Sequence, residues 1–280
     1  MNERFFLPLD NRIITFIGGG NMATALIGGL IASGVPPALI RVGEPDADRR
    51  AALQRDYGIH AQADNVAAID GADVVVFAVK PQVLPDIARS AAAAIAVGRP
   101  LVMSIAAGVT TSALSGWLGG DVAMVRAMPN TPALIGKGAA GLYANAAVSA
   151  AGRNTATAIM EAAGDVIWID DEDLMDAVTA VSGSGPAYFF LVIELMEQAA
   201  VELGLEPADA RRLVTQTALG AASMAKAGDV DAAELRRRVT SPGGTTAAAL
   251  AVFEEGGIGN LVTRALRAAR DRGRELSGKE

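Results

Sequence analysis

A glycine-rich segment near the start of the sequence has the spacing of a phosphate-binding turn. Gly18, Gly20 and Ala23 form the pattern G-x-G-x-x-A between an apolar run and an apolar helical pattern. In this pattern the first glycine permits a tight turn, the second lets a pyrophosphate approach the backbone, and the small third residue allows close helix–strand packing. The start of the helix would favour the phosphate charge. We therefore expect dinucleotide binding at Ile17, Gly18, Gly19, Gly20, Asn21, Met22 and Ala23.

The segment SPGGTT, residues 241–246, interrupts a helical pattern that resumes at once as an alanine-rich helix. Pro242 has no N–H and ends the preceding helix, while Gly243 and Gly244 permit backbone angles that other residues avoid. Thr245 and Thr246 then stand where a helix is capped or begins. Two interpretations remain open: an ordinary loop with a helix cap, or a cluster of backbone N–H groups that binds an anion.

Charged residues after the second predicted strand bear on the choice of dinucleotide. Glu44 follows Gly20 by 24 residues, near the place where a carboxylate binds the ribose hydroxyls in dinucleotide sites. Its charge would repel a 2′-phosphate and favour NAD. Arg41, Arg49 and Arg50 could offset that repulsion and admit NADP. The sequence leaves NAD and NADP as alternatives.

The composition excludes several classes of protein. The 280 residues are 51% hydrophobic but 4% aromatic, which predicts a core of Ala, Val, Leu and Ile. The net charge of −7 opposes nucleic-acid binding. Cysteine is absent, which rules out disulfides and zinc–thiolate sites and fits a cytoplasmic protein. The single histidine, His60, has no neighbours at a metal-binding spacing, so we expect a solvated residue, no metal site and no histidine catalyst.

No segment has the pattern of a targeting signal or a membrane span. The leading residues 1–12 contain an apolar stretch that Pro8 interrupts and that is too short for a signal peptide. No uninterrupted apolar run reaches the roughly 18 residues that a membrane span needs. The nearest, residues 90–109, is broken by Arg99 and Pro100. We expect no membrane association.

The first half of the sequence alternates apolar runs with amphipathic segments. This alternation predicts an α/β fold with a mostly parallel sheet covered on both faces. The predicted strands are residues 13–17, 39–42, 73–79, 101–105, 122–127, 138–143 and 166–169. Predicted helices between them include residues 21–33, 47–57 and 82–94. We assign residues 1–170 to a Rossmann dinucleotide-binding domain.

Residues 171–280 carry helical patterns and no strand pattern, so we assign them to an all-α domain. Breaks are expected at residues 183–186 and 204–207, where glycine precedes proline. Between them, residues 186–203 are apolar nearly all round, with Glu194 and Glu197 as the main exceptions. A helix of this kind must be buried on most sides, and a domain of this size has limited interior for it. We therefore expect the helical domain to dimerise.

Four further segments, taken with the glycine-rich turn, resemble the pyrroline-5-carboxylate reductase family. They read AVKP at residues 78–81, RAMPNTP at 126–132, DAVTAVSGSGPAYFF at 176–190 and TSPGGTTAAALAVFE at 240–254. Their order and spacing follow that family from residue 13 to residue 275. The resemblance implies a homodimer, or a higher oligomer of dimers, with the active site between the two domains. It also implies the last step of proline synthesis, in which NADPH or NADH reduces 1-pyrroline-5-carboxylate to L-proline.

The resemblance implies roles for individual residues. The N–H groups of residues 243–245 would bind the substrate carboxylate, braced by Ser241, and the Thr246 hydroxyl would lie near the ring nitrogen. Plain helix capping by a threonine is the alternative. Lys80 would act electrostatically near the nicotinamide, and a solvated loop lysine is the alternative. The other residues expected to line the cofactor are Glu44, Asn65, Ala78, Val79, Pro81, Ile105, Ala106 and Ala107.

Two other functions share parts of this pattern. A hydroxy-acid dehydrogenase of the same architecture would need a lysine or histidine acid in the helical half, where only Lys226 and Lys279 occur. A catalytically silent nucleotide-binding protein would be supported by a damaged SPGGTT segment, and here the segment is intact. The role of Asn130 in MPNTP is undecided, because its side chain either contacts the cofactor or only holds the turn. The reductase is the function that the sequence favours.

Overall fold

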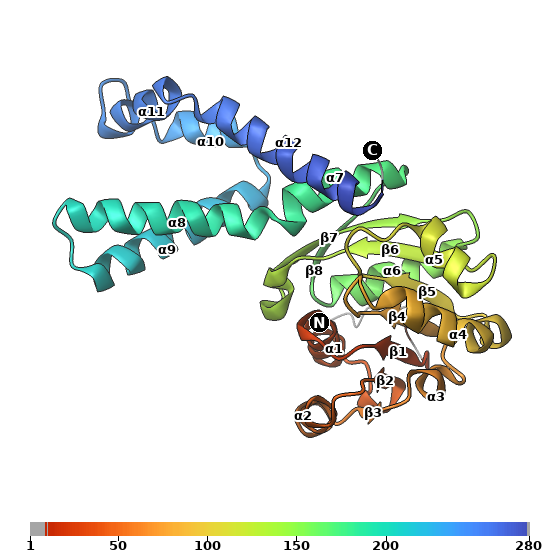
Figure 1. Cartoon of the computed structure of the whole chain (residues 1–280). Coiled ribbons are helices and arrows are strands. Elements are labelled where there is room, and N and C mark those ends of the chain that lie inside the picture. Colours follow the sequence, from red (N-terminus) through yellow and green to blue (C-terminus); the bar gives the residue numbers. More distant parts are fainter. Residues whose placement is uncertain (1–8, 10, 279–280) are drawn as a thin grey trace. The chain divides into compact units, whose positions relative to one another are not determined.

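The computed structural model describes residue 9 and residues 11–278 (Figure 1). The expectations for residues 1–8 and 10, which form most of the leading segment, lie outside the described residues. The described chain forms two compact units. The first comprises the residues up to Ser184 together with those from Ala269 onward, and the second comprises Gly185–Ala268. The C-terminal residues therefore pack with the N-terminal part of the sequence.

The first unit is built on one eight-stranded sheet. The strand order is β3-β2-β1-β4-β5-β6-β7-β8, and each neighbouring pair is parallel except β6 with β7. Every strand predicted from the sequence is present, which confirms the mostly parallel sheet. The sequence does not predict β3, because its three residues, His-Ala-Gln, carry no apolar run. The strands are β1 (Ile14–Ile17), β2 (Ile40–Gly43), β3 (His60–Gln62), β4 (Val74–Phe77), β5 (Leu101–Ser104), β6 (Met124–Met128), β7 (Gly138–Ala144) and β8 (Gly164–Trp168).

The position of β1 creates the crevice in which such sheets bind ligands. β1 lies between β2 and β4, so the order of strands reverses there. Its last residue, Ile17, is in register with Gly43 of β2 and Phe77 of β4, and the carboxyl ends of the three strands therefore meet at one edge. In open α/β sheets, ligands bind outside the carboxyl ends of the strands at this switch point.

Helices cover both faces of the sheet, as predicted. One hydrophobic cluster joins the sheet to α1 (Asn21–Ala32), α2 (Ala47–Tyr57) and α6 (Ala150–Glu161). A second cluster joins it to α3 (Asn65–Ile69), α4 (Leu84–Gly98) and α5 (Thr111–Leu118). Phe16 and Ile17 enter opposite clusters, because successive side chains alternate across a strand. Burial on both faces explains why these strands read as continuous apolar runs.

A buried ion pair joins the sheet to the chain that leaves it. Nη1 of Arg126, a residue of β6 that is 3% exposed, lies 3.0 Å from Oε1 of Glu172. The same carboxylate accepts hydrogen bonds from the amide and hydroxyl of Thr111, at 2.8 and 2.6 Å. Thr111 begins α5, so the carboxylate also lies at the positive end of that helix. Because removing one partner of a buried pair costs about 3–5 kcal/mol, this pair anchors residue 172 to the sheet.

Within the described residues, the second unit consists of helices, as predicted. They are α8 (Gly185–Glu202), α9 (Pro207–Ala227), α10 (Ala232–Arg238), α11 (Thr245–Glu255) and most of α12 (Ile258–Leu276). Strands end with β8 at Trp168, which agrees with the predicted change to helices near residue 170. The compact units divide later, at Ser184, because residues 172–184 remain attached to the sheet through Glu172 and α7 (Met175–Val178).

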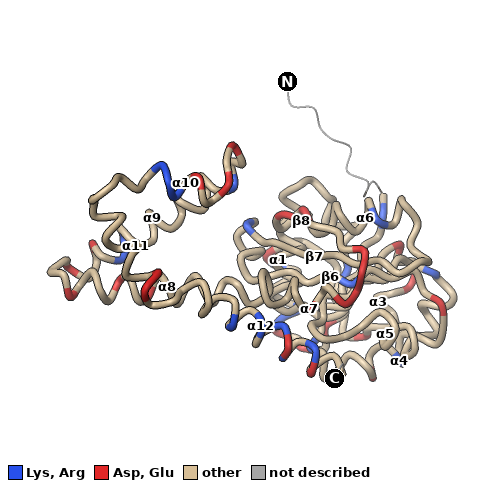
Figure 2. Tube along the Cα trace, turned by 90° about the horizontal axis from the view of Figure 1, so that it is seen from above, with Lys and Arg blue, Asp and Glu red and all other residues tan. Residues whose placement is uncertain are grey.

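Large apolar side chains of α8 are exposed along much of its length. Phe189 and Phe190 are 71% and 62% exposed. The others on this helix are Leu191, Val192, Leu195, Met196 and Val201. The trace of α8 is mostly tan in Figure 2, with few charged residues along it. Contiguous apolar surface of this kind is unfavourable in water, by about 25 cal/mol per Å². The burial expected from the sequence must therefore come from another chain.

One stretch of the described chain, Glu172–Glu202, is long and apolar enough by length and composition to cross a membrane. The mean hydropathy of its most apolar window is 1.4, and 11% of that window is buried. The stretch is not an uninterrupted apolar run, because Glu194 and Glu197 lie within it. A helix that packs its apolar side chains against another subunit has the same length and composition as a membrane span.

Helix α12 begins in the second unit and ends in the first. Close to its end, the Ser277 hydroxyl donates to Oδ1 of Asp176 at 3.3 Å, and a Cβ added to Gly273 would lie 3.3 Å from the same oxygen. Asp176, in α7, is 3% exposed. The C-terminal residues thus complete the surroundings of a buried carboxylate in the first unit.

Candidate functional site

The turn after β1 approaches the turn after β4 so closely that Gly18 cannot carry a side chain. Its φ is +96°, and an added Cβ would lie 2.7 Å from Cγ1 of Val79 and 2.9 Å from the Ala78 carbonyl oxygen. The Gly18 amide donates to the Gly43 carbonyl at 2.8 Å. The glycine is therefore required by the protein itself, both for its left-handed backbone and for this contact.

Gly20 is different, because nothing in the protein requires it to be glycine. It is the N-cap of α1, its φ is −70°, and an added Cβ would meet no atom within 4 Å. No side chain caps the helix at this end. Behind it, Ala23 is buried and packs in the core. The structure thus presents an open, uncapped helix start at the switch point, where a dinucleotide pyrophosphate is expected.

Glu44 is buried beside this turn and supports it. One carboxylate oxygen accepts a hydrogen bond from the Gly19 amide at 2.8 Å, and the other accepts from the Asp46 amide at 3.0 Å. Arg49 lies 3.6 Å from the same carboxylate, and Arg50 donates to the carbonyls of residues 44 and 45 at 2.8 Å. The carboxylate therefore stays close to the glycine turn, and both nearby arginines already have partners.

The remaining residues predicted to line a cofactor gather at the same edge of the sheet. Ala78 continues the ladder beyond β4 by donating to the Ile17 carbonyl, and Ile105 donates to the Phe77 carbonyl. Asn65 lies against Gly43, and its Oδ1 is buried without a hydrogen-bond partner among the described residues. Lys80 is exposed, and its ammonium has no ion-pair partner in the described part of the chain. Val79 and Pro81 flank it, and Ala106 and Ala107 follow Ile105.

Asn130 holds two backbone segments together, and its side chain is 8% exposed. Its Oδ1 accepts from the Ala139 amide at 2.9 Å, and its Nδ2 donates to the Ser182 carbonyl at 3.0 Å. Both ends of the amide are therefore used within the protein, which favours the structural role over contact with a cofactor. The contact with Ser182 could not be predicted from the sequence, because the two residues are 52 positions apart.

Residues 241–246 belong to the second unit and form a turn that leads into α11. Gly243 has φ +70°, and the Gly244 amide donates to the Ser241 carbonyl at 3.1 Å. A Cβ on Gly244 would lie 2.6 Å from Oγ of Ser241, so Ser241 packs directly against the turn. The N-cap is Gly244, and no side chain caps the helix. Helix capping by Thr245 or Thr246 is therefore wrong, and the amides that open α11 are left uncapped.

Arginines cluster at the end of the helix that precedes this turn, α10 (Figure 2). Arg237 and Arg238 donate to Glu234, and these hydrogen bonds lower the pKa of Glu234 below its usual value. Arg236 has no ion-pair partner among the residues described. The uncapped start of α11 thus follows an arginine-rich segment of the chain, in which two of the three arginines are paired with Glu234.

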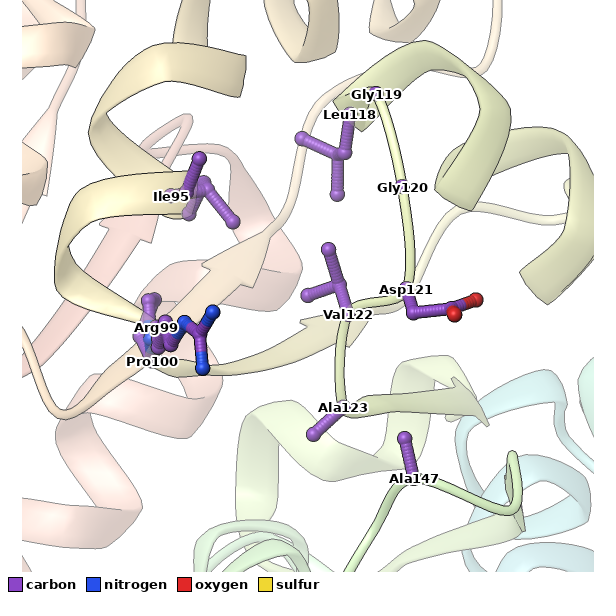
Figure 3. A pocket seen from close by; sticks show the side chains of 11 residues that line it. Ile95, Arg99, Pro100, Leu118, Gly119, Gly120, Asp121, Val122, Ala123 and Ala147 are labelled. Atoms are coloured by element: carbon purple, nitrogen blue, oxygen red, sulfur yellow. The ribbon is translucent and has the colours of Figure 1, made fainter.

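A surface cavity of about 500 Å³ lies at the opposite edge of the sheet (Figure 3). Pro100 directly precedes β5, and Val122 and Ala123 directly precede β6. In Figure 3 the carboxylate of Asp121 points away from the apolar side chains of Ile95 and Leu118. The cavity shares no residue with the predicted cofactor site. It is therefore separate from the candidate site.

No metal centre is present among the described residues, where no group of three His, Cys, Asp or Glu side chains comes together. His60 is exposed at the start of β3, as expected. The candidate site is thus built from backbone amides, glycines, one lysine and one buried carboxylate. These groups can bind and orient a dinucleotide and an anion, and they include no strong general acid.

Fold and site together define a nicotinamide-dinucleotide oxidoreductase with a Rossmann unit and a helical assembly unit. Residues 13–108 match the family model described as NADP oxidoreductase coenzyme F420-dependent. Residues 172–276 match the model described as pyrroline-5-carboxylate reductase dimerisation. The second match covers α8, whose apolar side chains need another chain to cover them.

Similar proteins agree with both matches. The pyrroline-5-carboxylate reductase of Pseudomonas aeruginosa is 52% identical over 264 residues, which are 94% of this chain and 96% of that one. A solved pyrroline-5-carboxylate reductase from Coxiella burnetii has a TM-score of 0.92 and 44% identity, covering 95% and 98% of the two chains. A Plasmodium falciparum enzyme solved with NADP bound has a TM-score of 0.84 and 28% identity, with coverage of 95% and 98%. The chain belongs to the pyrroline-5-carboxylate reductase family.

Replacing Gly20 by Ala should separate ligand binding from folding. The backbone at Gly20 suits alanine and the new Cβ meets no protein atom, so the free energy of unfolding should change by less than about 1 kcal/mol. The same Cβ would face a bound pyrophosphate, so the Kd for NAD(H) or NADP(H) should rise about tenfold or more, or 1.4 kcal/mol. Isothermal titration calorimetry and thermal melting measure the two effects.

The matched control is Gly116→Ala in α5, where an added Cβ also meets no atom within 4 Å. It should bind the dinucleotide as tightly as the unchanged chain. Equal affinity of Gly20→Ala and the unchanged chain would contradict the assignment of the phosphate site.

Proposed function

We propose that this chain reduces 1-pyrroline-5-carboxylate to L-proline with a reduced nicotinamide dinucleotide, the last step of proline biosynthesis. The observation that carries the proposal is the uncapped start of α11, where the amides after Gly244 are not engaged by any side chain. A substrate carboxylate is the anion that fits such a site in a chain of this family. The open glycine turn at Gly20 supplies the second requirement, a place for the dinucleotide.

The chemistry of the reaction suits a site of this composition. A bound reduced nicotinamide supplies the hydride. A cyclic imine that arrives protonated accepts hydride without a strong general acid, so orientation and electrostatics are what the protein must contribute. The N–H groups of residues 243–245 bind the carboxylate and Ser241 braces the turn. The Thr246 hydroxyl, on a half-buried residue, accepts a hydrogen bond from the N–H of the protonated ring nitrogen.

The dinucleotide is held by the carboxyl edge of the sheet. Residues 18–20 and the first turn of α1 bind the pyrophosphate, and the exposed Lys80 adds positive charge beside the nicotinamide end. Asn65, which lies against Gly43 at this edge, lines the same side of the cofactor. Residues 78–81 and 105–107 line the cofactor between these two ends.

We propose NADH as the preferred cofactor of the two. The carboxylate of Glu44 is fixed by the amides of Gly19 and Asp46, so a 2′-phosphate would be placed beside a negative charge. Arg49 lies 3.6 Å from that carboxylate and Arg50 donates to two carbonyls, so both arginines already have partners within the protein. Asp46 also caps α2, so the start of that helix already holds an anion. The NADP bound to the Plasmodium falciparum relative shows that the family admits the phosphorylated cofactor as well.

The assembly that we propose is a homodimer in the cytoplasm. The exposed apolar side chains of α8, Phe189 and Phe190 among them, lie within the matched dimerisation region. The same side chains on a second copy are partners of the right chemistry, because both sets are apolar and largely exposed. The absence of cysteine fits a reducing compartment.

The purified protein should oxidise NADH, and more slowly NADPH, only when 1-pyrroline-5-carboxylate is present. The loss of absorbance at 340 nm measures the rate, and L-proline formed in equal amount identifies the product. Gly20→Ala serves as the control with a damaged dinucleotide site. Binding of dinucleotide without any substrate-dependent oxidation would overturn the proposal in favour of a silent nucleotide-binding protein.

Replacing Thr246 by Val should lower kcat by about 30-fold, the effect of losing a hydrogen bond of about 2 kcal/mol to a charged group. Valine keeps the shape of threonine without its hydroxyl, so the melting temperature and the Kd for dinucleotide should be retained. Thr246→Ser keeps the hydroxyl and should keep most of the activity. Unchanged kinetics in Thr246→Val would remove this hydroxyl from the mechanism.

Replacing Glu44 by Gln should shift the cofactor preference towards NADPH. Removing the charge removes its repulsion of the 2′-phosphate, so the ratio of kcat/KM for NADPH to that for NADH should rise about tenfold, or 1.4 kcal/mol. Asp48→Asn is the matched control, since it removes an exposed carboxylate four residues further along the chain, in the first turn of α2. If both variants shifted the ratio equally, overall charge and not Glu44 would set the preference.

A further inference from the structure

The junction between the two units is a π-helical turn. α7 ends at Val178 and the π turn spans Thr179–Gly183, where the Ser184 amide donates to the Thr179 carbonyl at 2.8 Å. Ser184 itself is not helical, and α8 begins at Gly185. Turns of this kind are rare inside helices and are found frequently at functional sites. The first compact unit ends at the same residue, Ser184.

Pro186 leaves one carbonyl of this junction without its helical donor. In an α-helix the carbonyl of a residue accepts from the amide four residues later. Ser182 lies in the π turn, and the residue four positions later is Pro186, which has no N–H with which to continue the α-helical register. Ser182 is half-buried, and a carbonyl that lacks its helical donor in such a place is stabilised by a donor from elsewhere.

Asn130 supplies that donor from the carboxyl edge of the sheet. Its Nδ2 donates to the Ser182 carbonyl at 3.0 Å, while its Oδ1 accepts from the amide of Ala139, the second residue of β7. Asn130 follows β6, whose carboxyl end lies at the same edge as those of β1 and β4. One side chain therefore connects the junction to the edge that carries the dinucleotide site.

The π turn and the residue before it are packed closely against β6 and β7. A Cβ on Gly183 would lie 2.7 Å from Cε of Met128, the last residue of β6. A Cβ on Gly141 of β7 would lie 2.6 Å from Cγ1 of Val178. Glycine at both positions lets the backbone of β7 and of the π turn approach their neighbours. The hydrogen bond from Asn130 then fixes which carbonyl faces the sheet.

We propose that Asn130 is a positioning residue for the reduction: it replaces the missing N–H of Pro186 and fixes the π turn that joins the dinucleotide-binding unit to the unit carrying residues 243–246. This inference rests on the proposed function, because the positioned groups are those assigned to cofactor and substrate. Asn130 touches neither of them directly. Its effect acts through the backbone of residues 182–184.

The experiment compares Asn130→Asp with a matched variant, Asn145→Asp. Aspartate at 130 still accepts from Ala139 but places a second acceptor against the Ser182 carbonyl. Asn145 bridges backbone groups in the same way, with Oδ1 accepting from Met124 and Nδ2 donating to Val122, at the opposite end of β6. Both variants should lose similar thermal stability. Only Asn130→Asp should lower kcat/KM for 1-pyrroline-5-carboxylate, about tenfold, with the Kd for dinucleotide changed by less than twofold.

Pro186→Ala provides a second test, because it gives Ser182 a helical donor. In the Pro186→Ala background, Asn130→Asp should lower kcat/KM by less than threefold, a coupling that separate structural effects would not produce. Equal losses of kcat/KM in Asn130→Asp and Asn145→Asp, or the same loss with and without Pro186, would overturn the inference.

Amide hydrogen exchange keeps this inference separable from the proposed function. In Asn130→Asp, the amides of residues 183 and 184 should exchange faster than in the unchanged chain, while Asn145→Asp leaves them as they were. This result requires no catalytic turnover. Unchanged exchange at these two amides in Asn130→Asp would also overturn the inference, whether or not the protein reduces the imine.

Discussion

The site depends on one constraint, the parallel register that brings the carboxyl ends of β1, β2, β4 and β5 to one edge. The ladder continues past the strands, since the Gly18 amide bonds to Gly43, that of Ala78 to Ile17 and that of Ile105 to Phe77. Each of these bonds lies at the first residue of a connecting segment. The connections are therefore fixed in place by the sheet before any side chain contributes. This arrangement produces a site made largely of backbone groups. A reduction in which the cofactor supplies the hydride requires few further groups from the protein.

Buried charge marks the places where a segment outside the sheet joins it. Glu44 ties the second connection to the glycine turn through two amides. The pair of Arg126 and Glu172 ties the chain after β8 to β6 and to the start of α5. Asp176 receives the hydroxyl of Ser277 from the far end of the sequence. Each of these carboxylates has at least one partner from a distant segment, and such partners reduce the cost of burying the group.

Most of the fold could be predicted from the sequence because most strands of the sheet are buried on both faces. That burial makes each a short apolar run, and the spacing between them leaves room for covering helices. β3 could not be predicted in this way, because an edge strand of three residues contains no apolar run. The boundary between the compact units, at Ser184, does not coincide with the change from strands to helices near residue 170. Glu172 and α7 follow that change in the sequence but pack against the sheet.

The residues of the candidate site also differ in whether the sequence could predict them. Positions set by local geometry, such as Gly18, Gly20 and Gly243, can be read from residue type and spacing. Gly20 is the clearest example, because no contact within the protein requires a glycine there and ligand binding is left as the reason for it. The partners of Glu44 and Asn130 cannot be read in this way, because they arise when distant segments meet. A proline at 186 is a signal that some donor must be found, but it does not say which residue provides it.

The path of α12 has a consequence for biosynthesis of the chain. The first unit contains residues from Ala269 onward, so it is discontinuous in sequence and encloses the second unit as an insertion. A ribosome delivers the residues in order, and Ser277 reaches Asp176 only after translation has passed every helix of the second unit. The surroundings of Asp176 in the first unit can therefore be completed only after the second unit has been synthesised. Premature stop codons just upstream of residue 269 would leave that carboxylate open to water while sparing every strand.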